Sequence, residues 1–167
     1  MEDFEKNILL YCLDYCIDDF FNSVEKYIKY EENDVKDVVV KNGTAVLWIG
    51  ACIYKLKNQN NDYTNEEKKI IDAFKAAVNA LKHNLTIVKI IDSAIISSPI
   101  CGSYRSCGND AGSRFNRKNT RVIIWEEMKS GTVWSNSNIN DYNTVLSLKD
   151  VHEGIEKIRD IIKKYLN

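Results

Sequence analysis

Apolar residues recur at helical spacing over three long stretches in the first half of this chain and over a fourth at its end. The stretches cover residues 3–30, 34–57 and 64–83, and the last begins near residue 150. The chain of 167 residues has one Pro and seven Gly, so few positions interrupt a helix or provide the tight turns of a many-stranded fold. The sequence therefore predicts a mainly α fold, a bundle of about four helices.

Local patterns mark the start of two of these helices. Thr64 is followed three residues later by Glu67, the spacing of a capping box, in which the two residues bind each other's backbone N–H groups. Asp150 and Glu153 repeat this spacing before the last helix, although Ser147 with Asp150 offers a rival start. We expect both helices to begin at a side-chain cap.

The second helix is predicted to lie at the centre of the bundle. Residues 45–53 are apolar on nearly every side, which is typical of a helix that is buried all round. Gly43 and Gly50 lie seven residues apart on the same side, and each costs about 1 kcal/mol of helix propensity relative to Ala. We expect another helix to approach closely at these two positions.

The first helix has a broad apolar stripe. One run repeats every four residues and comprises Phe4, Ile8, Cys12, Cys16, Phe20 and Val24. A second set, spread over more than one side of the helix, includes Leu9, Leu10, Leu13, Ile17 and Phe21. This spread exceeds what a single packing face needs, so we expect a homodimer that buries part of this helix or of the third helix.

Residues 85–146 interrupt the helical pattern. Residues 121–128 are rich in β-formers and predict a strand, and a Ser-Gly turn then leads to a returning strand at 132–134. We therefore expect one domain over the whole chain, with a small β-hairpin insertion at about 85–146, before the last helix. Residues 85–96 are rich in Ile, Thr and Val, and they either form a strand or extend the third helix.

Composition argues against several classes of protein. The net charge of −1 gives no general attraction to nucleic acid or to membranes. The longest uncharged apolar stretch, residues 42–54, is too short to span a bilayer, and the acidic start lacks the features of a signal peptide. The five Cys are an odd number without a metal-binding spacing. We expect a cytoplasmic protein with no metal, no cofactor and no membrane association.

The third helix ends in a line of polar groups. Asp72, Lys75, Asn79 and His83 follow one another at steps of three, four and four residues, beside the apolar stripe of the same helix. Such a line could form a reactive site or a solvated face. A His in the last turn also interacts favourably with the negative end of the helix, by about 0.3–1 kcal/mol.

The order Asn79, three residues, His83 resembles the signature of HEPN domains, which are small all-α domains of prokaryotic defence and toxin–antitoxin systems. Their motif is an Arg, a polar residue that is often Asn, a few more residues and a His, near the end of a late helix. The resemblance covers about residues 1–84 and the final helix. It implies a homodimeric, metal-independent ribonuclease whose catalytic residues are His83 and Asn79, with the His moving a proton.

The sequence departs from this signature at Val78, where the motif has its Arg. That Arg would stabilise charge on the phosphate, and the nearest cations, Lys75 and Lys82, could act only as point charges. We therefore expect a non-catalytic or weakly active HEPN-like binding protein, with RNA or a cognate protein as partner. The alternatives are a ribonuclease that uses His83 and Asn79 with an Arg from the insertion, and a structural protein-interaction module.

Basic residues gather in the insertion. Four of the five Arg of the chain fall within 17 residues, where only Asp110 opposes them. The candidate anion-binding residues there are Arg105, Arg114, Arg117, Lys118 and Arg121. Arg can bind phosphate through two parallel hydrogen bonds, so this cluster predicts a site for RNA or another anion. The alternative is a solvated loop whose Arg side chains pair with acids of the domain.

Overall fold

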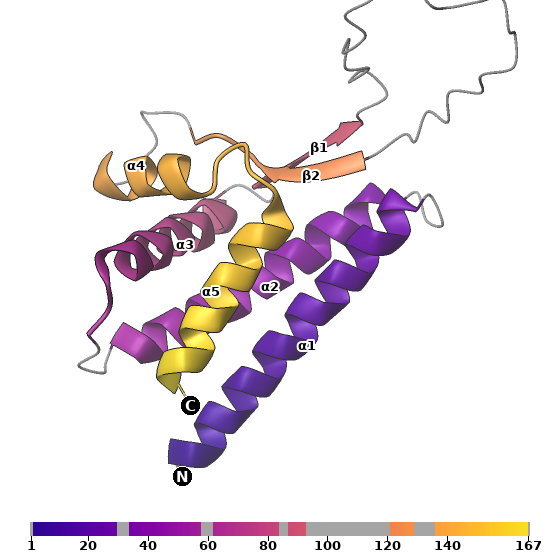
Figure 1. Cartoon of the computed structure of the whole chain (residues 1–167). Helices are drawn as coiled ribbons and strands as arrows, with labels where there is room; N and C mark the ends of the chain where they lie inside the picture. Colours follow the sequence, from indigo (N-terminus) through magenta and orange to yellow (C-terminus); the bar gives the residue numbers. More distant parts are fainter. Residues whose placement is uncertain are drawn as a thin grey trace, which may run out of the picture.

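The computed structural model describes residues 2–29, 34–57, 62–83, 87–92, 121–128 and 136–166, and helices make up 80% of these residues. The prediction of a mainly α fold is confirmed (Figure 1). The elements in chain order are α1 (Glu2–Ile28), α2 (Val35–Lys57), α3 (Asn65–His83), β1 (Val88–Asp92), β2 (Arg121–Trp125), α4 (Asn136–Val145) and α5 (Val151–Leu166).

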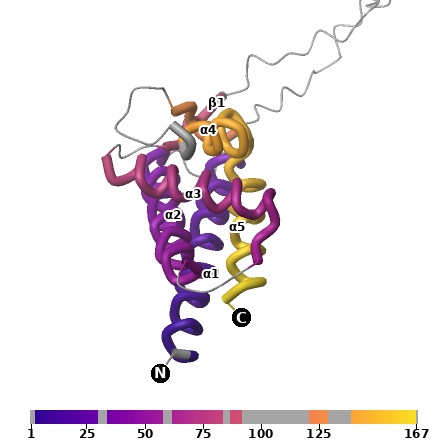
Figure 2. The backbone as a smooth tube through the Cα atoms, turned by 90° about the vertical axis from the view of Figure 1, so that its left-hand side faces the viewer, coloured from indigo at the N-terminus to yellow at the C-terminus, as the bar shows by residue number. Residues whose placement is uncertain are grey.

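The helices enclose one apolar core. α1 and α2 form an antiparallel pair, α5 lies beside both, and α3 packs on the side of α2 and α5 that faces away from α1 (Figures 1 and 2). The largest fully buried side chains of the helices include Leu13, Phe20, Ile49, Leu56, Phe74, Tyr142, Ile155 and Ile158. Of the helices described, none is long and apolar enough to cross a membrane.

Both predicted caps are present. The Thr64 N–H donates to Glu67 Oε2 (2.8 Å), and the Glu67 N–H donates to Thr64 Oγ1 (3.1 Å). The side chain of Lys164 pairs with the same carboxylate at 2.8 Å, and hydrogen bonds from Lys164 and from the Thr64 backbone lower the pKa of Glu67 to about 2. At the start of α5, Asp150 Oδ1 accepts the backbone N–H of His152 at 2.7 Å. The last helix therefore begins after Asp150.

The two glycines of α2 face α3, as expected. A Cβ atom on Gly43 would lie 3.6 Å from Leu81 Cδ1, and a Cβ atom on Gly50 would lie 2.8 Å from Val78 Cγ2. The first distance is an ordinary van der Waals contact, whereas the second is a steric clash. The contact of α2 with α3 is therefore closer at Gly50 than at Gly43.

Because only Gly50 lacks room for a Cβ atom, replacing Gly with Ala should change the free energy of unfolding in opposite directions at Gly43 and Gly50. Gly43→Ala should raise the free energy of unfolding by about 0.5–1 kcal/mol, because Ala is the better helix former. Gly50→Ala should lower it by about 1–2 kcal/mol, because Val78 must move to make room. Urea denaturation of both variants checks this. An equal gain in both would contradict the close contact at Gly50.

The expected small β element before the last helix is confirmed, and the partner that the structure shows for β2 lies in the segment that the sequence left open between strand and helix. β2 pairs antiparallel with β1, with Val88 opposite Trp125 and Asp92 opposite Arg121. The ambiguous stretch at 85–96 is therefore a strand over 88–92, and α3 ends at His83. The expected returning strand at 132–134 lies outside the described residues.

Helix α4 was not predicted. Its sequence is rich in Asn, which is a poor helix former, so local propensity gives no sign of it. Packing on α3 and buried contacts hold it instead. Tyr142 is fully buried and donates its hydroxyl hydrogen to the carbonyl oxygen of Glu126 at 2.8 Å. The side chain of Asn143 bonds both the N–H and the carbonyl of Met128.

The apolar stripe of α1 differs from the predicted one. Leu13, Ile17 and Phe20 are fully buried, but Phe4 and Ile8 are exposed. The reason is geometric: a repeat of four residues advances by about 40° more than a full turn at each step, so it moves around the helix. The run that began at Phe4 therefore reaches the core only further along α1. Leu9, Leu10 and Phe21, which we expected to meet a second copy, pack against the core of their own chain.

Candidate functional site

The predicted polar stripe lies along α3 at the boundary between core and solvent. Lys75 Nζ lies 2.7 Å from Asp72 Oδ1, and both side chains are partly exposed. Asn79 is half-buried, whereas Lys82 and His83 are exposed at the end of the helix. The stripe therefore changes from half-buried to solvated along its length.

A cleft of about 280 Å³ lies between α2 and α3, at the middle of this stripe. Polar groups from both helices line it: Tyr54, Lys57, Lys75 and Asn79. Gly50, Ile53 and Val78 form its apolar wall. Its size is just below that of small-molecule sites, about 300–1,000 Å³, so it fits a side chain or a small anion better than a nucleotide.

His83 is not part of this cleft. It is the last residue of α3 and lies one turn beyond Asn79. The two candidate catalytic residues therefore share a stripe, but of the two only Asn79 lines this cleft. This position of His83 also places it where a cation interacts favourably with the negative end of the helix.

Val78 occupies the place of the motif's Arg, and its side chain packs on α2. Its Cγ atoms would clash with any Cβ atom at Gly50, so the two residues are in close contact. Val78 is half-buried and packs against the core with the other apolar residues of α3. As an apolar side chain it supplies no charge at the position where the motif has its Arg.

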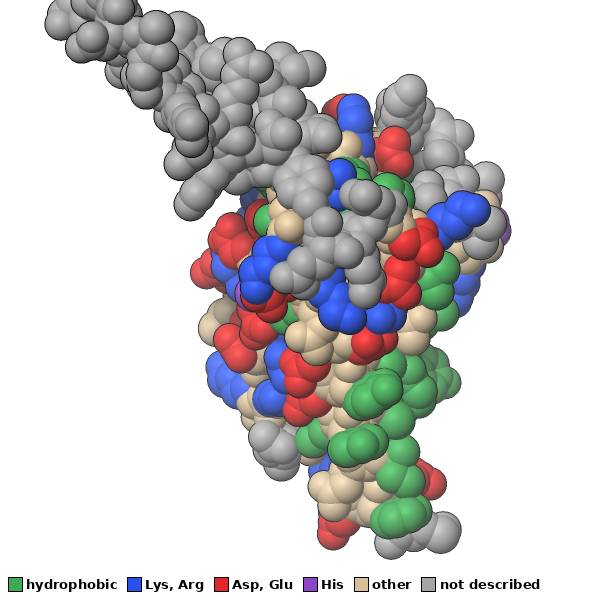
Figure 3. All heavy atoms as spheres, turned by 90° about the vertical axis from the view of Figure 1, so that its right-hand side faces the viewer, with side chains coloured by type: hydrophobic (Ala, Val, Ile, Leu, Met, Phe, Trp, Pro, Cys, Tyr) green, Lys and Arg blue, Asp and Glu red, His purple; other side chains and the backbone are tan. Residues whose placement is uncertain are grey.

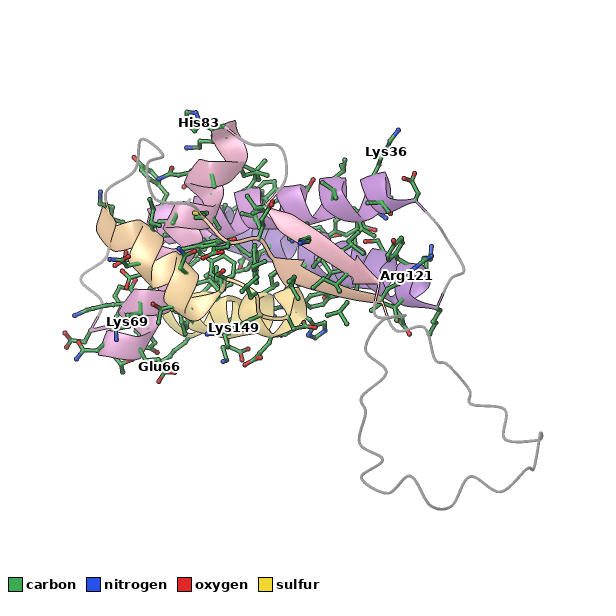
Figure 4. All side chains as sticks on the ribbon, turned by 90° about the horizontal axis from the view of Figure 1, so that it is seen from above. Lys36, Glu66, Lys69, His83, Arg121 and Lys149 are labelled. Atoms are coloured by element: carbon green, nitrogen blue, oxygen red, sulfur yellow. The ribbon has the colours of Figure 1, made fainter. Side chains whose placement is uncertain are left out.

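The Arg cluster is described at one position only, because Arg105, Arg114, Arg117 and Lys118 lie outside the described residues. Arg121 begins β2 and donates from Nη1 to the carbonyl oxygen of Tyr27 at 3.1 Å. Its guanidinium also lies over the Tyr27 ring, 4.3 Å from the ring centre. These contacts join β2 to the end of α1. Figure 4 shows Arg121 and His83 far apart, so these two residues do not share a site.

A second cleft, of about 250 Å³, lies between α3 and the turn that precedes α5. Six charged residues line it, three acidic and three basic: Glu66, Lys69, Lys149, Asp150, Glu153 and Lys157. Figure 4 shows Glu66, Lys69 and Lys149 near one another. Lys149 Nζ donates to the carbonyl oxygens of Thr144 and Val145, so it closes the end of α4. Because acidic and basic residues are equal in number, this cleft favours neither an anionic nor a cationic ligand.

Two of the cysteines that the structure describes, Cys16 and Cys52, have a raised thiol pKa, which disfavours the reactive thiolate. Burial raises the pKa of the Cys52 thiol to about 12, so it stays protonated at neutral pH. Burial and the nearby Cys12 and Asp19 raise the pKa of Cys16. Within the described part of the chain, no three His, Cys, Asp or Glu side chains are placed to hold a metal ion.

The sequence reading missed an uncharged surface on the outer side of α1 and α2. We call it the α1/α2 apolar face, and its exposed residues are Phe4, Ile8, Tyr11, Tyr15, Val40, Leu47 and Tyr54. The sequence held the necessary pattern, since Val40, Leu47 and Tyr54 are spaced by seven and Phe4, Ile8, Tyr11 and Tyr15 by four, three and four. Because the middle of α2 is apolar on nearly every side, the sequence predicted that this helix is buried all round.

Comparisons of the chain with protein-family models, with curated proteins and with solved structures find no match.

Proposed function

We propose that this protein acts by binding and not by catalysis, as a degenerate HEPN-like domain. The observation that carries the proposal is the contact of Val78 with Gly50, because the motif's cationic position is used for helix packing. By resemblance, its setting would be a prokaryotic defence or toxin–antitoxin system. Its partner would be RNA or a cognate protein.

The position of His83 supports the same proposal. General acid–base catalysis needs the His within hydrogen-bond reach of the reacting atoms, on a substrate held in place. The cleft beside Asn79 is not lined by His83, so nothing in that cleft would align a phosphate with the imidazole. Loss of one preorganised charge donor typically costs about a hundred- to thousandfold in rate. Little activity should therefore remain.

The rival function is a metal-independent ribonuclease. The exposure of His83 favours it, because a long RNA could reach the imidazole from solvent. It would need an Arg from elsewhere, and Arg121 is held against Tyr27. Only the remaining members of the cluster, outside the described residues, could supply the charge. Binding of RNA by that cluster stays a prediction.

A cleavage assay with added chelator tests the proposal. Wild type, His83→Ala and Val78→Arg are compared on a long single-stranded RNA. We expect wild type to match His83→Ala, because Val78 puts an apolar side chain where the motif has the Arg that would stabilise charge on the phosphate. Val78 is half-buried at the edge of the cleft, so the Arg of the variant can extend its charged end into the cleft while its stem packs.

The Val78→Arg variant distinguishes two origins of inactivity. Cleavage that appears only in this variant would show that the fold keeps a catalytic geometry without its charge. Circular dichroism must first show that the variant remains helical, because the replacement enlarges a side chain at a tight contact. Cleavage by wild type that is lost in His83→Ala would overturn the proposal in favour of the ribonuclease.

A further inference from the structure

The α1/α2 apolar face is the most exposed hydrophobic surface of the described structure. Its four aromatic side chains, Phe4, Tyr11, Tyr15 and Tyr54, are 64–72% exposed. Figure 3 shows hydrophobic side chains gathered on the lower part of the molecule, where the first half of α1 lies. The rings of Tyr11 and Tyr15 stack at a centroid distance of 6.4 Å, so part of the face is already ordered.

Two ion pairs fix how α1 and α2 lie beside each other. Lys55 Nζ lies 3.5 Å from Glu5 Oε2, and Lys41 Nζ lies 3.1 Å from Asp19 Oδ1. The segment 4–15 of α1 therefore lies level with the segment 45–56 of α2. The exposed side chains of both helices therefore lie at the same heights along the pair, where one partner surface can meet both.

The spacing within this surface is that of a helix–helix seam. On α2 the positions Val40, Thr44, Leu47, Ala51 and Tyr54 alternate steps of four and three residues, and all five are exposed. On α1, Phe4, Ile8, Tyr11 and Tyr15 alternate in the same way. Neither set includes a charged residue. Apolar residues at alternating steps of three and four are the pattern by which one helix packs along another.

The exposed area suits a protein interface. An aromatic side chain presents roughly 150–250 Å², so these four rings alone expose on the order of 500 Å². Ile8, Val40 and Leu47 are 44–65% exposed and add to this area. The sum approaches the roughly 800 Å² that each partner buries in a standard interface, and it exceeds the largest apolar patch of most monomers.

We infer that a second copy of this chain covers the α1/α2 apolar face. In the arrangement that aligns both seams, a two-fold axis runs along the helices and places α1 of one copy on α2 of the other. Tyr11 of each copy then lies near Leu47 of its partner, because these residues are almost level. The result is a four-helix bundle in which the α1–α2 pair of one copy packs on the α1–α2 pair of the other.

The charges around the face favour a second copy over a lipid surface. Helices that lie on membranes carry Lys and Arg beside their apolar side, which attract anionic lipids. The edge of α1 toward α5 carries Asp14 and Asp18, and Arg159 of α5 pairs with both. Lys41 and Lys55 of α2 are paired with Asp19 and Glu5 of α1, so these lysines do not form an unpaired basic border. A net charge of −1 opposes self-association only weakly.

This inference deepens the proposed function, on which it rests, by naming the protein partner as a second copy. The face includes none of Lys75, Asn79 and His83. Tyr54 of the face also lines the cleft beside Asn79, but Tyr11 and Leu47 do not, so a dimer centred on these two residues differs from one built on the motif. Different measurements test the two proposals. An RNA cleavage assay tests binding without catalysis, and the molecular mass in solution tests the dimer on the α1/α2 apolar face.

Sedimentation equilibrium at tens of micromolar protein tests the inference. Wild type should have twice the 19.2 kDa mass of one chain. Tyr11→Lys and Leu47→Glu should each weaken the dimer by about a hundredfold or more, since each places an unpaired charge in an apolar seam. Leu148→Lys is the matched control, because Leu148 is equally exposed but lies in the turn before α5. It should stay dimeric.

Mixing the two variants tests the arrangement. If α1 packs on α2 of the partner, Tyr11→Lys and Leu47→Glu should form a one-to-one dimer, because one Lys–Glu pair and one native contact result. A monomeric wild type, a dimer that both variants retain, or a mixture that stays monomeric would each overturn the inference. So would binding of wild type, but not Tyr11→Lys, to phosphatidylcholine–phosphatidylglycerol vesicles.

Discussion

Replacing Trp125 with Ala is expected to lower the free energy of unfolding by about 3–5 kcal/mol, the usual cost of deleting a fully buried Trp side chain. The ring of Trp125 is fully buried and meets Phe74 edge-on at 5.5 Å and Tyr142 edge-on at 6.4 Å. Its backbone N–H donates to the carbonyl of Lys149, and its carbonyl accepts from Leu148. One residue thus joins the sheet to α3, α4 and the start of α5.

Urea denaturation measures this loss, with Trp48→Ala as the matched control. Trp48 is only half-buried on α2, so the same chemical change should cost clearly less there. Equal losses at the two sites would contradict the central place of Trp125. A loss below about 1 kcal/mol at Trp125 would show that the sheet does not pack on the bundle.

Arg159→Met is expected to lower the free energy of unfolding by about 2 kcal/mol at neutral pH, since it leaves partly buried carboxylates without their partner. The Arg159 side chain is 15% exposed, and its Nε lies 2.7 Å from Asp14 Oδ1. Lys163 also reaches Asp14, at 2.8 Å, so this group joins α1 to α5. Lys157→Met is the control, because its pair with Glu153 is exposed and should contribute at most about 0.5 kcal/mol.

The same group predicts a dependence on pH. Burial alone would raise the pKa of Asp14, but hydrogen bonds from Lys163 and Arg159 outweigh burial and hold it below its ordinary value of 3.8. Asp14 therefore stabilises the fold fully above pH 3.8, and this contribution is lost as the pH falls through the lower value. Asp14→Asn should be less stable than wild type at pH 7, by about 1 kcal/mol after solvent screening. The two should converge in strong acid, and a constant difference would contradict this.

Local physics made most of the helices predictable. The apolar spacing gave α1, α2, α3 and α5, and the short-range chemistry of Thr64 and Glu67 gave the start of α3. Each of these features depends on residues within about one or two turns of one another. A close approach of another helix at Gly50 was also predictable, because a Gly within a buried helix commonly marks one, but the sequence did not identify Val78 as the partner.

Features that depend on distant partners were not predictable. β2 pairs with a strand about thirty residues earlier in the chain, and its own sequence suits a nearby partner just as well. α4 forms through its packing on α3, in spite of its Asn-rich sequence. Leu148, in the turn before α5, adopts a positive φ of 59°, which is unusual for a residue other than Gly. The local sequence does not predict this backbone conformation.

In the candidate site, too, features set by nearby residues were predictable and features set by distant residues were not. The sequence placed Asn79 and His83 on one stripe and Val78 on the apolar one, because all three positions follow from helix geometry. It could not show that the cleft beside Asn79 ends before His83, because that depends on where α2 passes. It also assigned Phe4 and Ile8 to the core, because a spacing of four alone does not distinguish a buried stripe from an exposed one.

The most direct test of binding without catalysis is a single-turnover cleavage assay with protein in excess over RNA, in chelator, across pH 5 to 8. General acid–base catalysis by a side chain gives a rate that depends on pH. We predict that wild type and His83→Ala give the same background rate at every pH. A wild-type rate that varies with pH and falls at least tenfold in His83→Ala would contradict the account.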